Sequence, residues 1–309
     1  MRLRNPPVGI HGSIINNFAL DEVVRELYFD DNIEAAWEHG LERGLSREDV
    51  RFYRLLEAEH LTRQRAVILS IEPQLSLEYD PNEKGFDPEV TPYVVRDECN
   101  ALARRFQWKY DEAIRVTILT TEVDTPWSYY RAGYCVDKYP YEKVCIPAYS
   151  LHAPNEFGRI LRHEFMHAVT LNVCNGHEPV WLTEGLSVLV ENQIRSRYWM
   201  KFKMGLLEWR TAMFLNGGID GNRWDQSEVD RIRQGYEQAY IVVSYLHKLE
   251  GDKGLIALMK AIGDESVARN VKRTILGQSN TDSALRSVFD LSEEAVFQEA
   301  YKWLQSVPF

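Results

Sequence analysis

The sequence contains few cysteines, and their spacing excludes two common kinds of site. Cys99, Cys135, Cys145 and Cys174 lie far apart among 309 residues, and no two of them form a CxxC pair. This arrangement indicates neither a zinc site made of thiolates nor a small disulfide scaffold. Cys135 and Cys145 could face each other across a hairpin, but buried free thiols are the favoured interpretation.

The sequence also lacks long apolar runs and an excess of basic residues. No run approaches the roughly 20 apolar residues that a membrane-spanning helix requires, and the start of the chain has no continuous apolar stretch. We therefore expect no membrane segment, no export signal in this chain and a cytoplasmic location. The formal net charge of −10 argues against nucleic-acid binding, because phosphate contacts need a basic surface.

The first third of the chain changes character at about residue 67. With 45% hydrophobic and 27% charged residues, the composition is that of a globular protein. Residues 1–66 carry apolar side chains at three- and four-residue spacing, which predicts a helical N-terminal extension. The pattern after it predicts a strand over 67–80, a helix over 89–110 and a β-branched strand over 113–121.

The rest of the chain turns from strands to helices. Residues 127–147 are rich in tyrosine and valine around a turn, which predicts two short antiparallel strands. Beyond Asn155 nearly every segment has helical spacing, except 215–230, where glycines predict a flexible loop. We predict an α+β fold in which 67–309 form one domain, with an α/β part over 67–175 and a helical part over 176–309. The sequence gives no indication of the oligomeric state.

The stretch RILRHEFMHAVTLN places two histidines and a glutamate in a predicted helix. His163 and His167 are four residues apart and therefore point the same way, so that two imidazoles could share one metal ion. Glu164 lies beside that position, where a carboxylate can take a proton from the attacking water. Asn155 is expected to cap the helix, and Asn175-Gly176 to end it. The alternative is a buried histidine and a surface histidine without a metal.

A zinc site with one open position needs a third protein ligand. The next helical segment, GHEPVWLTEGLSVLVENQ, carries Glu184 in the middle of an apolar run. A carboxylate buried there is costly unless it is paired or bound to a cation, so Glu184 is the candidate third ligand. The alternatives are an exposed carboxylate and one buried against an arginine.

These two motifs together resemble a known family. HEFMH followed by P-x-W-L-x-E-G-L-S, from Pro179 to Ser187, is similar to the peptidase MA-like domain of the gluzincin metallopeptidases, relatives of thermolysin, over about residues 67–262. The resemblance implies a thermolysin-like zincin fold, a peptide or protein substrate and one Zn²⁺ per chain. It further implies the roles of four residues: zinc ligands His163, His167 and Glu184, and the general base Glu164.

The resemblance implies two further features. The family has a helix that opens with a tyrosine, which corresponds best to Tyr236, a candidate hydrogen-bond donor to the oxyanion; Tyr240, one turn later, is the other candidate. Such a donor is needed in addition to the metal. The family's edge strand for extended substrate corresponds to 142–150, where β-augmentation is expected, although an internal strand is an equal alternative.

The chain departs from both named branches of the clan. It lacks the aminopeptidase signature G-x-M-E-N and the thermolysin pattern N-E-x-x-S-D, and WLTEGLS stands in place of the second. The sequence therefore predicts a zinc metallopeptidase of gluzincin type without assigning a branch. Two alternatives use the same fold or residues. One is a catalytically silent zinc-binding scaffold or partner-recognition protein, whose N-terminal helices would serve as a docking surface. The other is a zinc hydrolase of non-peptide substrates. The presence of Glu164 favours an enzyme.

Overall fold

The computed structural model of the chain shows an α+β protein with a small mixed sheet. It describes residues 22–44, 50–110, 112–122, 133–137, 141–191, 196–218, 226–264 and 280–308. The chain divides into two compact units, of which one comprises the described residues between 11 and 104 and Trp108–Ala168, and the other comprises Arg105–Gln107 and the described residues from Val169 onward. No helix in the described ranges has the length and apolar character needed to cross a membrane.

The first unit is built on a five-stranded sheet with the order β1-β2-β3-β5-β4. β1 pairs with β2 and β4 pairs with β5 in antiparallel fashion, whereas β3 runs parallel to both of its neighbours. The strands are β1 (Val67–Glu72), β2 (Leu75–Tyr79), β3 (Ala113–Leu119), β4 (Tyr134–Asp137) and β5 (Tyr141–Pro147).

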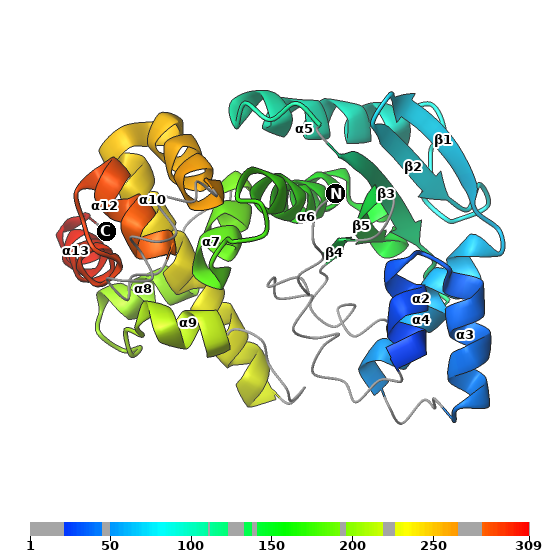
Figure 1. The fold of residues 1–309 in the computed structure, drawn as a ribbon, viewed down its shortest axis with the longest axis horizontal. Helices are drawn as coiled ribbons and strands as arrows, with labels where there is room; N and C mark the ends of the chain where they lie inside the picture. Colours follow the sequence, from blue (N-terminus) through cyan, green and yellow to red (C-terminus); the bar gives the residue numbers. More distant parts are fainter. Residues whose placement is uncertain are drawn as a thin grey trace. The chain divides into compact units, whose positions relative to one another are not determined.

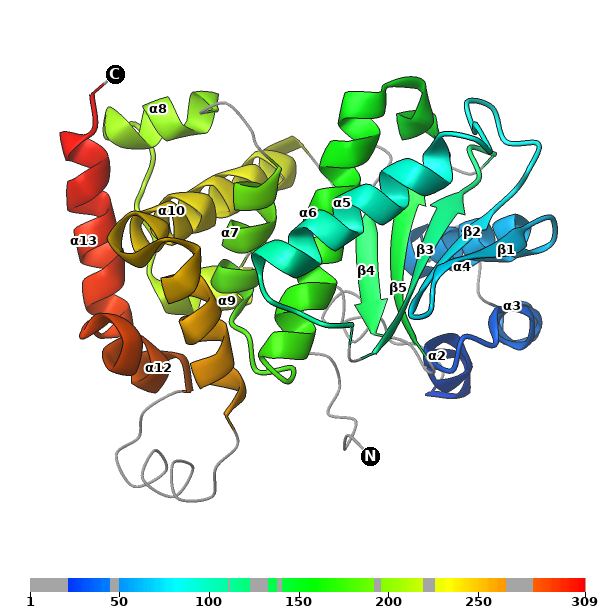
Figure 2. The ribbon, with the colours of Figure 1, turned by 90° about the horizontal axis from the view of Figure 1, so that it is seen from above.

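Helices cover both faces of this sheet (Figures 1 and 2). The N-terminal helices α2 (Glu22–Phe29), α3 (Ile33–Glu42) and α4 (Val50–Arg63) lie over one face. On the opposite face lie α5 (Thr91–Arg105) and α6 (Pro154–Val173), which follows the 3₁₀ helix η2 (Ala148–His152). The predicted helical character of the described N-terminal residues is confirmed, and these helices belong to the same compact unit as the sheet.

Two predictions about the strands are corrected by the structure. The segment 67–80 is a hairpin and not one strand, because β1 and β2 pair with each other on either side of residues 73–74. β5 is an internal strand, paired with β3 on one side and with β4 on the other. Of the two alternatives for 142–150, the edge strand is therefore wrong and the internal strand is confirmed, and among the described strands β4 is the edge on this side of the sheet. The antiparallel pairing of β4 and β5 confirms the predicted strand pair.

The boundaries of α6 differ slightly from the predicted ones. The helix begins at Pro154 and not after a cap at Asn155. Proline suits the first helical position because its missing N–H would have no partner inside the helix. At the other end, Asn175 and Gly176 have φ angles of 53° and 73°. This left-handed geometry ends the helix where the sequence predicts.

The second unit is helical, as predicted for the segments beyond Asn155. Its long helix, α10 (Gln226–Gly263), is interrupted at Gly251, whose φ of 61° and ψ of −160° are not helical. The helix α7 (Val180–Val190) crosses α10 closely, since a Cβ atom at Gly185 would lie 2.5 Å from the Ala239 carbonyl oxygen. The other helices of this unit are α8 (Arg197–Lys203), α9 (Ala212–Gly218), α12 (Asn280–Phe289) and α13 (Glu293–Ser306).

Two predictions in the helical unit are also corrected. The predicted flexible loop over 215–230 is helical at both ends, in α9 up to Gly218 and in α10 from Gln226, and its middle lies outside the described residues. The helix that carries Tyr236 does not open with that tyrosine, because α10 begins at Gln226. Tyr236 is therefore an interior residue of a long helix.

Candidate metal centre

The two histidines of the HEFMH motif lie on one side of α6. The ring centroids of His163 and His167 are 5.0 Å apart, and the ring planes are inclined by 72°. The helix holds them there because residues four apart lie one turn from each other. His167 is buried, with 7% of its surface exposed. The two imidazoles are thus close enough to bind one ion.

Glu184 is buried in an apolar helix, α7. Ten of the eleven residues of α7 are buried, and Glu184 itself is 0% exposed. A carboxylate in such surroundings loses its hydration, which costs several kcal/mol unless a cation or hydrogen bonds replace the water. The alternative of an exposed carboxylate is therefore wrong.

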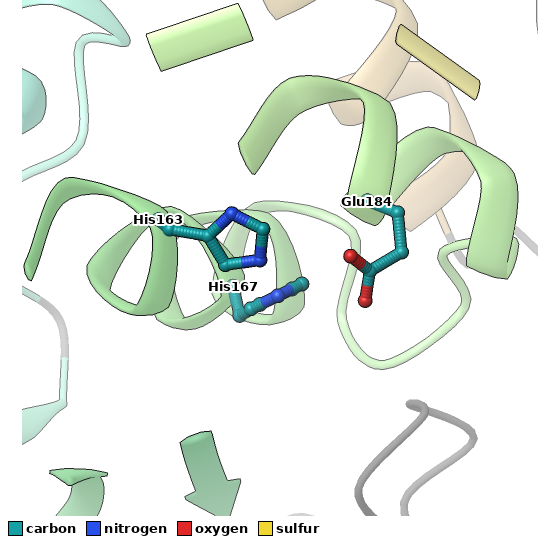
Figure 3. A group of neighbouring side chains, drawn as sticks. All are labelled: His163, His167 and Glu184. Carbon is teal, nitrogen blue, oxygen red and sulfur yellow. The ribbon is translucent and has the colours of Figure 1, made fainter. Parts of the chain in front are cut away.

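The structure brings His163, His167 and Glu184 together. Each offers a ligand atom, and these atoms all lie within 4.8 Å of one another. Figure 3 shows the Glu184 carboxylate directed toward the two imidazole rings. Two neutral imidazoles and one carboxylate form a donor set typical of a catalytic zinc ion, which keeps its fourth position for water or substrate. The residues present therefore fit such an ion.

Glu164 follows the first histidine and is held by its neighbours. Only 3% of its surface is exposed. A Cβ atom at Gly133 would lie 2.8 Å from the Cγ atom of Glu164, and 2.4 Å from the carbonyl oxygen of Cys145. Real Cβ atoms do not approach that closely, so only glycine fits between β5 and the Glu164 side chain. The backbone before β4 thus contacts the candidate general base.

Other residues of α6 fix the rotation of the helix. Arg162 donates a hydrogen bond of 2.7 Å to Glu98 on α5 and forms an ion pair with it. Phe165 is fully buried and packs against Trp108, with ring centroids 5.8 Å apart. Because these side chains anchor two faces of the helix, the histidines are directed to the third.

Contacts within the helical unit position α7. Besides the crossing at Gly185, the indole Nε1 of Trp181 donates a hydrogen bond of 2.8 Å to Glu293 at the start of α13. The Trp181 ring also meets Phe297 edge to face, at 5.5 Å between centroids. Trp181 and Gly185, which flank Glu184 in the WLTEG motif, thus have structural roles that explain why they occur there.

The two candidate tyrosines have different surroundings on α10. Tyr240 packs against Trp199 of α8, with 5.7 Å between ring centroids, and borders the apolar cluster of Phe202, Ile241 and Leu304. This packing is a sufficient reason for a tyrosine at that position. Tyr236 lies three residues before Ala239 and Tyr240 three residues before Val243, and both Ala239 and Val243 meet Gly185 of α7, so this crossing does not distinguish the two tyrosines.

No protein-family model matches this chain, and no curated protein matches it. The resemblance to gluzincin peptidases therefore depends on the two sequence motifs and on the geometry of His163, His167 and Glu184. The cysteines take no part in this geometry, because all four are buried free thiols, as expected. Burial raises the pKa of Cys99 and Cys174, which keeps these thiols protonated.

A group of buried charges on the other face of the sheet was not predicted. Lys143 of β5 is 1% exposed, and its Nζ lies 2.8 Å from Glu59 of α4 and 3.3 Å from Glu78 of β2. Burial lowers the pKa of Lys143, but the two carboxylates raise it more, so its pKa is above the ordinary value. The one available signal was a lysine within a strand of otherwise buried character.

Proposed function

We propose that this chain is a zinc-dependent peptidase of gluzincin type with a thermolysin-like zincin fold. The observation that carries the proposal is the meeting of two imidazoles and one carboxylate within 4.8 Å, with a glutamate directly after the first histidine. A metal-binding scaffold needs only the three ligands. Glu164 adds the base that metal-assisted hydrolysis requires.

His163, His167 and Glu184 would hold the ion. Glu184 supplies negative charge from a position that is otherwise costly for a carboxylate. A bound zinc ion supplies Lewis-acid chemistry, by which it lowers the pKa of a water molecule and polarises a carbonyl group. The site therefore suits the hydrolysis of an unactivated bond such as a peptide bond.

Glu164 would move the protons of the reaction. Its carboxylate accepts a proton from the attacking water and later gives it to the leaving amine. The negative charge that develops on the carbonyl oxygen needs a hydrogen-bond donor. Tyr236 and Tyr240 are the two candidates for this role, and the ring of Tyr240 also packs against Trp199.

The edge strand β4 is the proposed place for an extended substrate. In the sheet of described residues, β4 has a partner only on its β5 side, and the residue before it contacts Glu164. A peptide that added to this edge would gain backbone hydrogen bonds. It would also lie beside the proposed base.

The test combines metal analysis with a conservative change of Glu164. The purified protein should contain one zinc ion per chain, and a broad peptide library should be cleaved. Glu164→Gln keeps the size of the side chain but removes the base, so kcat/KM should fall by about 10²- to 10⁴-fold while the zinc content stays unchanged. His163→Ala is the matched control that loses both zinc and cleavage.

Three results would contradict the proposal. Absence of stoichiometric zinc in the wild-type protein would remove the metal site. Equal and negligible cleavage by the wild type and Glu164→Gln, with zinc present, would favour the scaffold. Cleavage of esters or other bonds, without cleavage of any peptide, would favour a zinc hydrolase of another substrate class.

A further inference from the structure

The buried carboxylate of Glu59 connects the N-terminal helices to the sheet. Glu59 lies on α4 and is 1% exposed. Its Oε1 accepts hydrogen bonds from the hydroxyls of Tyr28, at 2.7 Å, and Tyr134, at 3.0 Å. Its Oε2 lies 2.8 Å from the Nζ of Lys143. One carboxylate thus holds α2, β4 and β5 together.

Tyr134 is the residue through which this contact reaches the candidate site. It is the first residue of β4, directly after Gly133. Gly133 leaves no room for a Cβ atom, because such an atom would lie 2.8 Å from the Cγ of Glu164. A short chain of contacts therefore runs from Glu59 to Tyr134 and through Gly133 to Glu164.

A tether at this point matters because β4 is short and lies at the edge of the sheet. It has four residues, and in the sheet of described residues it is paired only with β5. Edge strands of this length open more easily than central strands. A buried hydrogen bond to a charged acceptor is stronger than one between neutral groups, so it can hold the first residue in place.

We propose that Glu59 is a positioning residue for Glu164, acting through Tyr134 and the backbone of Gly133. The N-terminal helices are then part of the catalytic unit and not a separate docking surface. The role of Glu164 in this inference rests on the proposed function. The tether itself does not, since it concerns the position of β4 in the folded protein.

Tyr28 and Tyr134 both donate hydrogen bonds to Oε1 of Glu59 and therefore provide a matched pair of variants. Tyr134→Phe removes the hydroxyl on β4, and Tyr28→Phe removes the hydroxyl on α2. Both rings are buried and remain in place, so neither change leaves a cavity the size of a side chain. Each variant loses a hydrogen bond to Glu59, and Tyr134→Phe also loses the contact of its hydroxyl with Cys145 of β5, so only this variant releases β4.

Amide hydrogen exchange measures the tether without any reference to activity. Tyr134→Phe should accelerate exchange across Gly133 and β4 by about tenfold, the change in local opening expected for the loss of one bond to a charged group. Tyr28→Phe should leave these amides within about twofold of the wild type. Equal acceleration by both variants, or acceleration by neither, would overturn the proposal.

Steady-state kinetics then tests the connection to Glu164, well below the unfolding temperature. Tyr134→Phe should lower kcat by about ten- to a hundredfold at unchanged zinc content, with a smaller rise in KM, because Glu164 acts in proton transfer. Tyr28→Phe should keep the wild-type kcat. An unchanged kcat despite faster exchange in β4 would overturn the positioning role. A wild type without peptidase activity would refute the proposed function, and the exchange result would still decide the tether.

Discussion

Buried glutamates in this chain differ in how their charge is balanced. For Glu78, burial raises the pKa, but Lys143 and Arg63 lower it more, so the pKa lies below the ordinary value of 4.5. For Glu237 on α10, burial raises the pKa, a hydrogen bond from Ser196 lowers it in part, and Glu191 raises it further. The first carboxylate is stabilised in its charged form and the second is not.

These opposite shifts predict opposite dependences of stability on pH. Glu78 binds a proton more readily in the unfolded chain, so its contribution is present above pH 4.5 and is lost as the pH falls below that value. Glu237 binds a proton more readily in the folded chain, so the folded protein gains stability as the pH falls toward the raised pKa.

Urea unfolding of two isosteric variants between pH 7 and pH 3 measures this difference. Glu78→Gln should have a lower free energy of unfolding than the wild type at pH 7, and this difference should become smaller as the pH falls. Glu237→Gln should be more stable than the wild type at pH 7, and this gap should also close at low pH. If both variants differed from the wild type in the same direction in their free energy of unfolding at pH 7, the charge balance would be wrongly assigned.

At the scale of elements, local sequence patterns predicted which segments form helices and strands better than they predicted which of these elements lie side by side. The spacing of apolar residues predicted α6, and a continuous apolar run predicted α7, which is buried almost on all sides. The edge position of β4 was not predictable from the pattern, since the order of strands depends on the parallel pairing of β3 with β5. Strand pairing across such a distance leaves no periodic signal in the chain.

Turn signals misled the prediction in two places. Glycines within 215–230 predicted a loop, but α9 extends to Gly218 and α10 begins at Gln226, because tertiary packing overrides weak propensity. Conversely, the break at Gly251 lies within a segment of continuous helical spacing. Its left-handed φ of 61° is one that glycine adopts without strain.

The crossing of α7 and α10 predicts a contrast between two glycines. Gly185→Ala would place a Cβ atom 2.5 Å from both the Ala239 carbonyl and a Val243 methyl group. The helices must separate, so the free energy of unfolding should fall by about 1 to 3 kcal/mol. Because Glu184 is the adjacent residue, zinc affinity should fall as well.

Gly158→Ala on α6 is the control for this change. Its Cβ atom would meet the ends of the Glu98 and Arg162 side chains at 3.2 and 3.3 Å, and such ends can move. Alanine also favours the helix by about 1 kcal/mol. Chemical denaturation should therefore show Gly158→Ala to be at least as stable as the wild type. A Gly185→Ala protein of wild-type stability would show that the crossing is less tight than the structure indicates.

At the scale of the whole molecule, the candidate site combines residues that the sequence predicted with residues that it did not. The grouping of His163, His167 and Glu184 was predictable because candidate metal ligands are recognised by their type and spacing. Glu59 and Gly133 were not predictable, because they act through Tyr134 and backbone contacts between segments distant in sequence. A glycine or a buried glutamate carries no such signature on its own.

The ligands contribute to the stability of the whole chain if zinc binds only to the folded protein. Zinc at 100 times its dissociation constant would then stabilise the fold by about 2.7 kcal/mol. We expect chelation to lower the midpoint of thermal unfolding and added zinc to restore it.

Glu184→Gln should abolish this response, because it replaces the charged ligand by a neutral amide in the same buried position. Glu164→Gln should retain it, since Glu164 is not a proposed ligand. A midpoint independent of zinc in the wild type would exclude a structural contribution of the ion, and equal responses in both variants would exclude Glu184 as a ligand.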